Sequence, residues 1–149
     1  MAQAKSLKFA QQSVLLGDGA TPTEIFTAPC GFTELTMTVN IETNTTNVPD
    51  CADPDLPAWL ASDEVSKQMT ISGNGILDTD AMQEWRDWLM VGGEKNVRWM
   101  TQGTAANGGG YFQAPAIMTA YEETGARGQR WSLSTTLTLN GKPTFTAAA

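Results

Sequence analysis

The sequence contains no histidine and only two cysteines, Cys30 and Cys51, in 149 residues. Without histidine, the commonest general base, the Ser-His-Asp and Cys-His catalytic arrangements and every His-based zinc motif are excluded. Two cysteines are too few for a zinc site built from cysteine alone. Cys30 lies in Ala-Pro-Cys-Gly-Phe, where no neighbouring base would activate a thiol, so we expect a buried or inert side chain. We therefore predict a protein that is not an enzyme, with no catalytic, cofactor-binding or metal-binding residue.

Charge and long apolar runs are also scarce. Only 17% of the residues are charged, the net charge is -7, and no basic cluster is present to neutralise a phosphate backbone. Tight binding to nucleic acid is therefore not expected. No stretch has the length of a signal peptide core or a membrane span, so we expect synthesis and folding in the cytoplasm. The length predicts one domain, residues 1–149, and the Thr- and Ser-rich composition is typical of a β-protein.

Strict alternation of apolar and polar residues predicts strands at 34–42 and 131–139. Their apolar faces would carry Leu35, Met37, Val39 and Ile41, and Trp131, Leu133, Thr135, Leu137 and Leu139. Their polar faces would carry Thr36, Thr38, Asn40 and Glu42, and Ser132, Ser134, Thr136 and Thr138. Less regular strand patterns occupy roughly 7–16, 67–73, 96–101 and 111–122. Several strands separated by turn signals predict a mainly β fold, an antiparallel β-sandwich or barrel.

One amphipathic helix is predicted at about residues 80–91 to flank the sheet. Thr79 or Asp80 can cap its first amides, Gln83 follows as in a capping box, and Gly92-Gly93 ends it. The residues at helical spacing on its apolar side are Ala81, Trp85, Trp88 and Leu89. The glycine-rich stretch 102–112 then predicts a hairpin tip.

A long acidic loop is predicted at about residues 43–68, TNTTNVPDCADPDLPAWLASDEVSKQ. Loops of this length are usually either functional or disordered. Its acids can be interpreted as a calcium site, although Pro54 and Pro57 disrupt the spacing of a calcium loop, or as a solvated or partner-facing loop. Trp59 lies outside the helix and strand patterns and allows sugar stacking as an alternative use. We predict that the loop binds a neighbouring subunit, through Pro49, Asp50, Asp53, Asp55, Leu56, Pro57, Trp59 and Leu60.

The order of these features resembles the tail tube (major tail) protein family of long-tailed bacteriophages and gene-transfer particles. An alternating Thr-rich strand is followed by the acidic loop, by QMTISGNGIL, by a helix and a glycine-rich hairpin, and by ETGARGQRWSLSTTLTLNGKPTFT. The resemblance extends from about residue 30 to residue 145. Its most specific parts are Ser-Gly-Asn-Gly at 72–75 and the Gly-Gln-Arg-Trp strand that ends in Asn-Gly-Lys-Pro at 140–143.

This resemblance implies a virion protein that self-assembles into hexameric rings, stacked into the hollow tube through which DNA is delivered. It implies an N-terminal arm at about 1–6, a C-terminal arm at about 141–149 and an inter-subunit loop at about 43–68, which would be mobile until assembly. The implied partners are other copies, a tape-measure protein, a distal tail or baseplate initiator and a tail terminator, without a membrane. Assembly in the host bacterial cytoplasm and residence in the virion tail follow.

The polar strand faces have two interpretations. In a tube, Thr36, Thr38, Asn40, Glu42, Ser132, Ser134, Thr136 and Thr138 would face the lumen. Such a wall would let DNA pass, because it offers no basic groups to hold phosphates. The residues alone favour the solvated side of a half-exposed sheet, and the family resemblance favours the lumen instead. The alternative functions are a tube protein of a contractile tail or type VI-like secretion apparatus, and a monomeric β-sandwich that binds carbohydrate.

Overall fold

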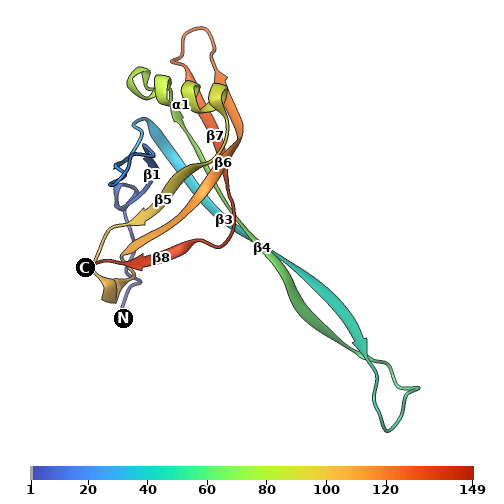
Figure 1. Cartoon of the computed structure of the whole chain (residues 1–149). Coiled ribbons are helices and arrows are strands. Elements are labelled where there is room, and N and C mark those ends of the chain that lie inside the picture. Colours follow the sequence, from blue (N-terminus) through green and yellow to red (C-terminus); the bar gives the residue numbers. More distant parts are fainter. Residues whose placement is uncertain (1) are drawn as a thin grey trace.

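The computed structural model describes residues 2–149, which form one eight-stranded antiparallel sheet and an α-helix (Figure 1). The strand order is β2-β1-β5-β6-β7-β4-β3, and β8 pairs with β6. The elements are η1 (Phe9–Gln11), β1 (Gln12–Gly17), β2 (Phe26–Thr27), β3 (Phe32–Val48), β4 (Trp59–Ile76), α1 (Thr79–Val91), β5 (Lys95–Thr101), η2 (Ala105–Asn107), β6 (Gly110–Thr124), β7 (Ser132–Leu139) and β8 (Thr144–Ala147).

The predicted fold class is confirmed, since the described chain is mainly β, antiparallel and flanked by a helix. The sheet curves round its core without closing into a barrel (Figure 1). The helix begins at Thr79, and its cap is Asp78, whose carboxylate accepts a hydrogen bond from the Asp80 backbone amide at 3.3 Å. The predicted cap at Thr79 or Asp80 was therefore wrong by one residue. Gln83 does not form the predicted capping box but donates to Asp87.

The predicted loop at 43–68 is instead most of a β-hairpin that extends away from the domain (Figure 1). Strands β3 and β4 pair from Phe32↔Gly75 out to Val48↔Trp59, so only residues 49–58 lie outside strands. Thr43, Thr45 and Thr46 are β-branched and suit an extended conformation, and pairing satisfies the backbone groups that a loop would leave to water. The acidic and proline residues that suggested a loop are concentrated in the turn itself.

A β-bulge interrupts the hairpin register midway. Glu42 lies opposite Ser66 whereas the next residue, Thr43, lies opposite Glu64, which leaves Val65 without a cross-strand partner. Because side chains alternate between the two faces of a strand, the extra residue changes which residues of β4, between the bulge and the turn, share a face with each residue of β3. Trp59 consequently shares a face with Val48.

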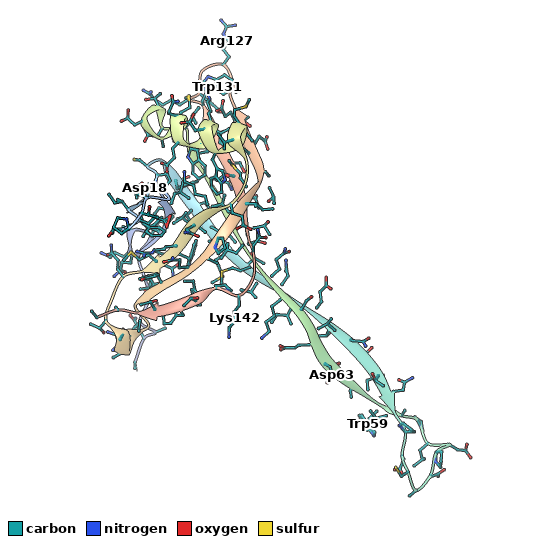
Figure 2. The ribbon with its side chains drawn as sticks, viewed as in Figure 1. Asp18, Trp59, Asp63, Arg127, Trp131 and Lys142 are labelled. Carbon is teal, nitrogen blue, oxygen red and sulfur yellow. The ribbon has the colours of Figure 1, made fainter. Side chains whose placement is uncertain are left out.

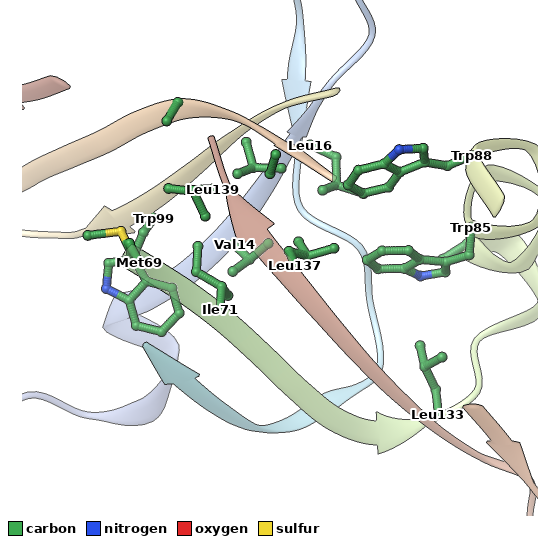
Figure 3. Packing of buried hydrophobic residues seen from close by; sticks show 14 residues of the cluster. Val14, Leu16, Met69, Ile71, Trp85, Trp88, Trp99, Leu133, Leu137 and Leu139 are labelled. Carbon is green, nitrogen blue, oxygen red and sulfur yellow. The ribbon is translucent and has the colours of Figure 1, made fainter. Parts of the chain in front are cut away.

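The hydrophobic core lies inside the curve of the sheet, and helix α1 contributes Trp85 and Trp88 at one end of it (Figure 3). Trp85 is completely buried, stacks on Trp88 at 6.2 Å between ring centroids, and meets Phe32 edge-on. The other core residues are Val14, Leu16, Met69, Ile71, Ala81, Val97, Trp99, Ala114, Ala116, Leu133, Leu137 and Leu139. Leu89 and Trp131, which the patterns place on apolar faces, are half-exposed, because Leu89 lies at the rim of the helix contact and Trp131 precedes β7.

Candidate interaction surfaces

The turn at the hairpin tip is organised by its own acids. The Asp50 carboxylate accepts hydrogen bonds from the backbone amides of Ala52 and Asp53, at 2.7 and 3.2 Å. Asp53 likewise accepts from the Asp55 amide at 3.3 Å. These short-range bonds are typical of Asx turns. Within residues 2–149 no group of three or more His, Cys, Asp or Glu side chains is arranged to hold a metal ion.

Apolar side chains at the same tip are exposed to solvent. Trp59 is 86% exposed and Leu60 67%, and Leu56 and Val48 are about half-exposed. Figure 2 shows Trp59 on the hairpin, far from the core of the domain. All of the predicted interface residues between Pro49 and Leu60 are exposed, in the turn or at the start of β4. Exposed apolar groups gathered on a projecting arm are typical of a surface that another protein covers.

The predicted polar face exists, but it is wider than the sequence indicated. Strand β4 lies between β3 and β7, so the two predicted polar rows are not directly paired. Thr38 lies opposite Thr70, and Thr70 lies opposite Thr138. The missed row on β4 consists of Ser66, Gln68, Thr70, Ser72 and Asn74. Alternation within 67–73 was visible in the sequence, but no pattern there showed that β4 separates β3 from β7.

This polar face continues across β7 onto the end of β6. Thr136 lies opposite Ala120, and Ser134 lies opposite Glu122. Thr119 stands at a bulge and its hydroxyl lies 3.2 Å from that of Thr138. The charged residues in these cross-strand rows are Glu34, Glu42 and Glu122, and no lysine or arginine is among them. The face is therefore polar and weakly acidic.

The four-stranded segment β3-β4-β7-β6 has a free edge at each end within residues 2–149. Strand β3 is the last strand of the sheet and pairs only with β4. Strand β6 pairs with β5 only as far as Ala116, so from Ile117 to Thr124 its one partner is β7. Free strand edges present unpaired N–H and C=O groups, which can pair with a strand from another chain.

A small polar network joins the helix to the end of β6. The Tyr121 hydroxyl donates to Glu123 at 2.7 Å, and Arg86 forms an ion pair with Glu123 at 3.4 Å. Burial, and then the hydrogen bond to Glu123, raise the pKa of Tyr121 to about 12. The same hydrogen bond lowers the pKa of Glu123. Tyr121 therefore stays protonated near neutral pH, and the network fixes the β6 end against α1.

The hollow between the β1–β2 connection and the end of α1 is also lined by acids. Asp18 accepts from the backbone amides of Ala20 and Ile25, which lowers its pKa. Glu24 accepts from the Asn96 side chain at 2.9 Å. These carboxylates are occupied in holding the connection in place. Cys30 and Cys51 are both free and exposed, so of the two alternatives expected for Cys30, buried or inert, the buried one is wrong.

None of the helices within residues 2–149 is long and apolar enough to span a membrane. A family model described as "Phage tail tube protein" matches residues 10–145. No protein of curated function matches the sequence.

Solved structures share the fold at low sequence identity. The tail of an empty gene transfer agent particle with C6 symmetry has a TM-score of 0.77 and 18% identity, covering 95% of this chain and 100% of that chain. The SPP1 tail tube has a TM-score of 0.69 and 11% identity, covering 96% and 80%. The sheath/tube terminator of an extracellular contractile injection system, PVC, has a TM-score of 0.62 and 13% identity, covering 98% and 100%.

Proposed function

The chain belongs to the phage tail tube protein family, and from this membership we propose that it is a structural virion protein that assembles into stacked hexameric rings. The rings form the hollow tube through which DNA reaches the host. The observation that carries the proposal beyond the family name is the four-stranded segment with two free edges and one continuous polar face.

The free edges suit closure into a ring. The segment holds an even number of strands that alternate in direction, so β3 and β6 run antiparallel to one another. Rotation about a ring axis leaves strand direction unchanged, and therefore the β3 edge of one copy meets the β6 edge of the next as an antiparallel neighbour. Pairing these edges satisfies the exposed backbone groups of both. Repeated around the axis, the segments make one barrel.

In this barrel the polar face lines the lumen. The proposed lumen-facing residues are the predicted Thr36, Thr38, Asn40, Glu42, Ser132, Ser134, Thr136 and Thr138, together with the β4 row. Short hydroxyl and amide side chains keep the wall hydrated, and its few charges are carboxylates. DNA passing such a wall finds no cation to replace its counterions, so it is not retained.

The hairpin links one ring to the next in this proposal. Its strands are already paired in the free subunit, so it is a preformed arm and only the turn is left to order on assembly. Preformed arms cost less entropy on binding than disordered ones. The C-terminal region proposed as a second arm includes β8, which pairs with Gly110–Gln113 of β6.

The remaining parts of the proposal follow from the family resemblance. Stacking of identical rings is open-ended, so the tube length is set by partners. We assign these roles to a tape-measure protein, a distal tail or baseplate initiator and a tail terminator, with assembly in the host bacterial cytoplasm. The role is structural rather than catalytic.

A contractile system is the second candidate. Its support is the similarity of fold to components of contractile injection systems, with TM-scores of 0.58 to 0.62. Such a tube must bind a sheath on its outer surface. Co-sedimentation of the assembled tube with a sheath protein encoded beside it would favour this candidate over a non-contractile tail. A monomer that binds glycans through Trp59 would favour the carbohydrate-binding alternative.

Electron microscopy of the concentrated, purified protein tests the proposal. We expect rings or hollow tubes with six-fold symmetry. A matched control is a variant in which residues 47–61 are replaced by Asn-Gly, which leaves the three-residue turn Thr46-Asn-Gly between the paired Thr45 and Ser62 and should stay folded without forming tubes. A wild-type protein that stays monomeric under all conditions, also after addition of the initiator proteins, would contradict the proposal.

A further inference from the structure

The core of the domain is open at the base of the hairpin. There Met69 of β4 is 7% exposed while Val39, directly opposite on β3, is 44% exposed. Phe112 packs against the edge of the core and contacts Phe145, with 4.9 Å between ring centroids and the two rings tilted by 50°. The core face of the sheet therefore continues beyond the core as an apolar surface that nothing in residues 2–149 covers.

A groove of about 640 Å³ occupies this place. Its apolar wall consists of Val39, Met69, Phe112 and Pro143, and its rim carries Lys67 and Lys142. Lys142 lies in the connection between β7 and β8, and forms no ion pair within the described residues. Lys67 pairs with Glu64 at 3.1 Å, but both side chains are largely exposed. The groove is thus apolar inside and basic at its rim, in a protein whose net charge is -7.

The hairpin tip has the opposite pattern. Leu56, Trp59 and Leu60 are exposed apolar side chains, and the acids Asp50, Asp53, Asp55 and Asp63 surround them. No lysine or arginine occurs between residues 47 and 63. Apolar side chains flanked by acids are complementary, in polarity and in charge, to an apolar groove flanked by lysines.

A chain cannot fill its own groove with its own tip. Val39 and Val48 are nine residues apart on strand β3, and at about 3.3 Å per residue this places the tip about 30 Å from the groove. The strands between them are paired throughout, so the arm does not fold back. Figure 2 shows Lys142 where the hairpin leaves the domain, and Trp59 and Asp63 further along the arm. The occupant of the groove must therefore come from another molecule.

We propose that the groove between the base of the hairpin and the β7–β8 connection is the receptor for the hairpin tip of a second copy of this chain. Trp59 enters the groove against Val39, Met69 and Phe112, and the tip acids face Lys142 and Lys67. The contact is heterologous, since one copy gives its tip and receives another at a different surface, and it repeats without closing. This inference rests on the proposed tube, and names the contact that joins its successive rings.

Zero-length cross-linking of wild-type tubes tests the assignment without a mutation. A carbodiimide joins a lysine amine to a carboxylate that touches it, and peptide mass spectrometry then identifies the pair. We expect a link from Lys142 to Asp50, Asp53 or Asp55. Tubes mixed from nitrogen-15-labelled and unlabelled chains should show this link between the two isotopic forms. Links from the tip acids to Lys5, Lys8 or Lys95 instead, or tubes without any Lys142 link, would overturn the receptor assignment.

A charge exchange provides the second measurement. Lys142→Glu should raise the critical concentration for tube formation about tenfold, and adding Asp55→Lys should restore it to within about threefold of wild type. Lys5→Glu is the matched control with the same change in net charge, and should leave the critical concentration unchanged. Absence of rescue would contradict the contact. Tubes that form with no Lys142 link refute this receptor alone, whereas failure of every variant and of wild type to form tubes refutes the proposed function as well.

Discussion

The Trp59→Ala substitution removes an indole that is 86% exposed in the free subunit and takes no part in the core. Substitutions at such positions usually change the free energy of unfolding by less than about 0.5 kcal/mol. The thermal melting curve of the free domain should therefore be unchanged. In the tube, however, the same side chain would be covered by a neighbouring subunit.

The cost to assembly can be estimated from the exposed area. A side chain of this size has a surface of about 200 Å², and at about 25 cal/mol per Å² covering its exposed part contributes at most about 4 kcal/mol. Ordering of the tip consumes part of this, which leaves about 2 to 3 kcal/mol for each contact. Each added subunit makes one such contact, so the critical concentration should rise about 30- to 150-fold.

Sedimentation of assembled tubes over a range of protein concentrations measures this quantity. Two controls separate folding from assembly. Val91→Ala changes a side chain that is also 86% exposed but lies on helix α1, and should leave both measurements unchanged. Trp85→Ala empties a completely buried site and should lower the free energy of unfolding by about 3 to 5 kcal/mol. An unchanged critical concentration for Trp59→Ala, with an unchanged melting curve, would refute the role of the tip.

Excision of residues 47–61, with Thr46 and Ser62 joined by Asn-Gly, should leave the melting temperature within a few degrees of wild type, because no core residue lies between Thr43 and Gln68. If circular dichroism showed a molten or aggregated product, the hairpin would be needed for folding. Lysine substitution of Thr36 and Thr136, both on the polar face, should preserve tubes but make them retain a labelled oligonucleotide in a salt-dependent way, unlike wild type. Equal retention by the variant and the wild-type tubes would argue against a lumenal position of these residues. Tyr121 has its pKa raised from 10.0 to about 12, so its contribution to stability is complete below pH 10 and is lost as the pH rises toward 12. Urea unfolding between pH 9 and 12 should therefore show a steeper loss of stability for wild type than for Tyr121→Phe, and parallel curves would count against a raised pKa of Tyr121.

Local patterns predicted strands and the helix well where apolar and polar residues recur at the spacing of the element. The strands at 34–42 and 131–139 lie within β3 and one residue off β7, and the predicted helix differs from α1 by a residue at its start. In these segments burial on one face imposes the alternation, so the pattern is visible without the partner strand.

Long-range pairing was not visible in the same way. Residues 43–48 and 59–66 are exposed on both faces, so burial imposes no alternation on them and they resembled a loop. What makes them strands is hydrogen bonding to each other across the turn. The order of strands in the sheet also depends on contacts far apart in sequence, which is why the row of β4 between the two predicted polar rows was missed.

The bulge at Val65 determines more than a local irregularity of the hairpin. With the extra residue, Trp59 projects from the same side of the arm as Thr46 and Val48, while Leu60 projects from the side of Asn47. If the register of Glu42 and Ser66 continued to the turn without the bulge, Val48 would lie opposite Leu60, and Leu60 would project from the side that Trp59 now occupies. The bulge at this single position therefore determines which of the two anchors projects from which side of the arm, and in the proposed tube it selects the one that faces the receiving groove.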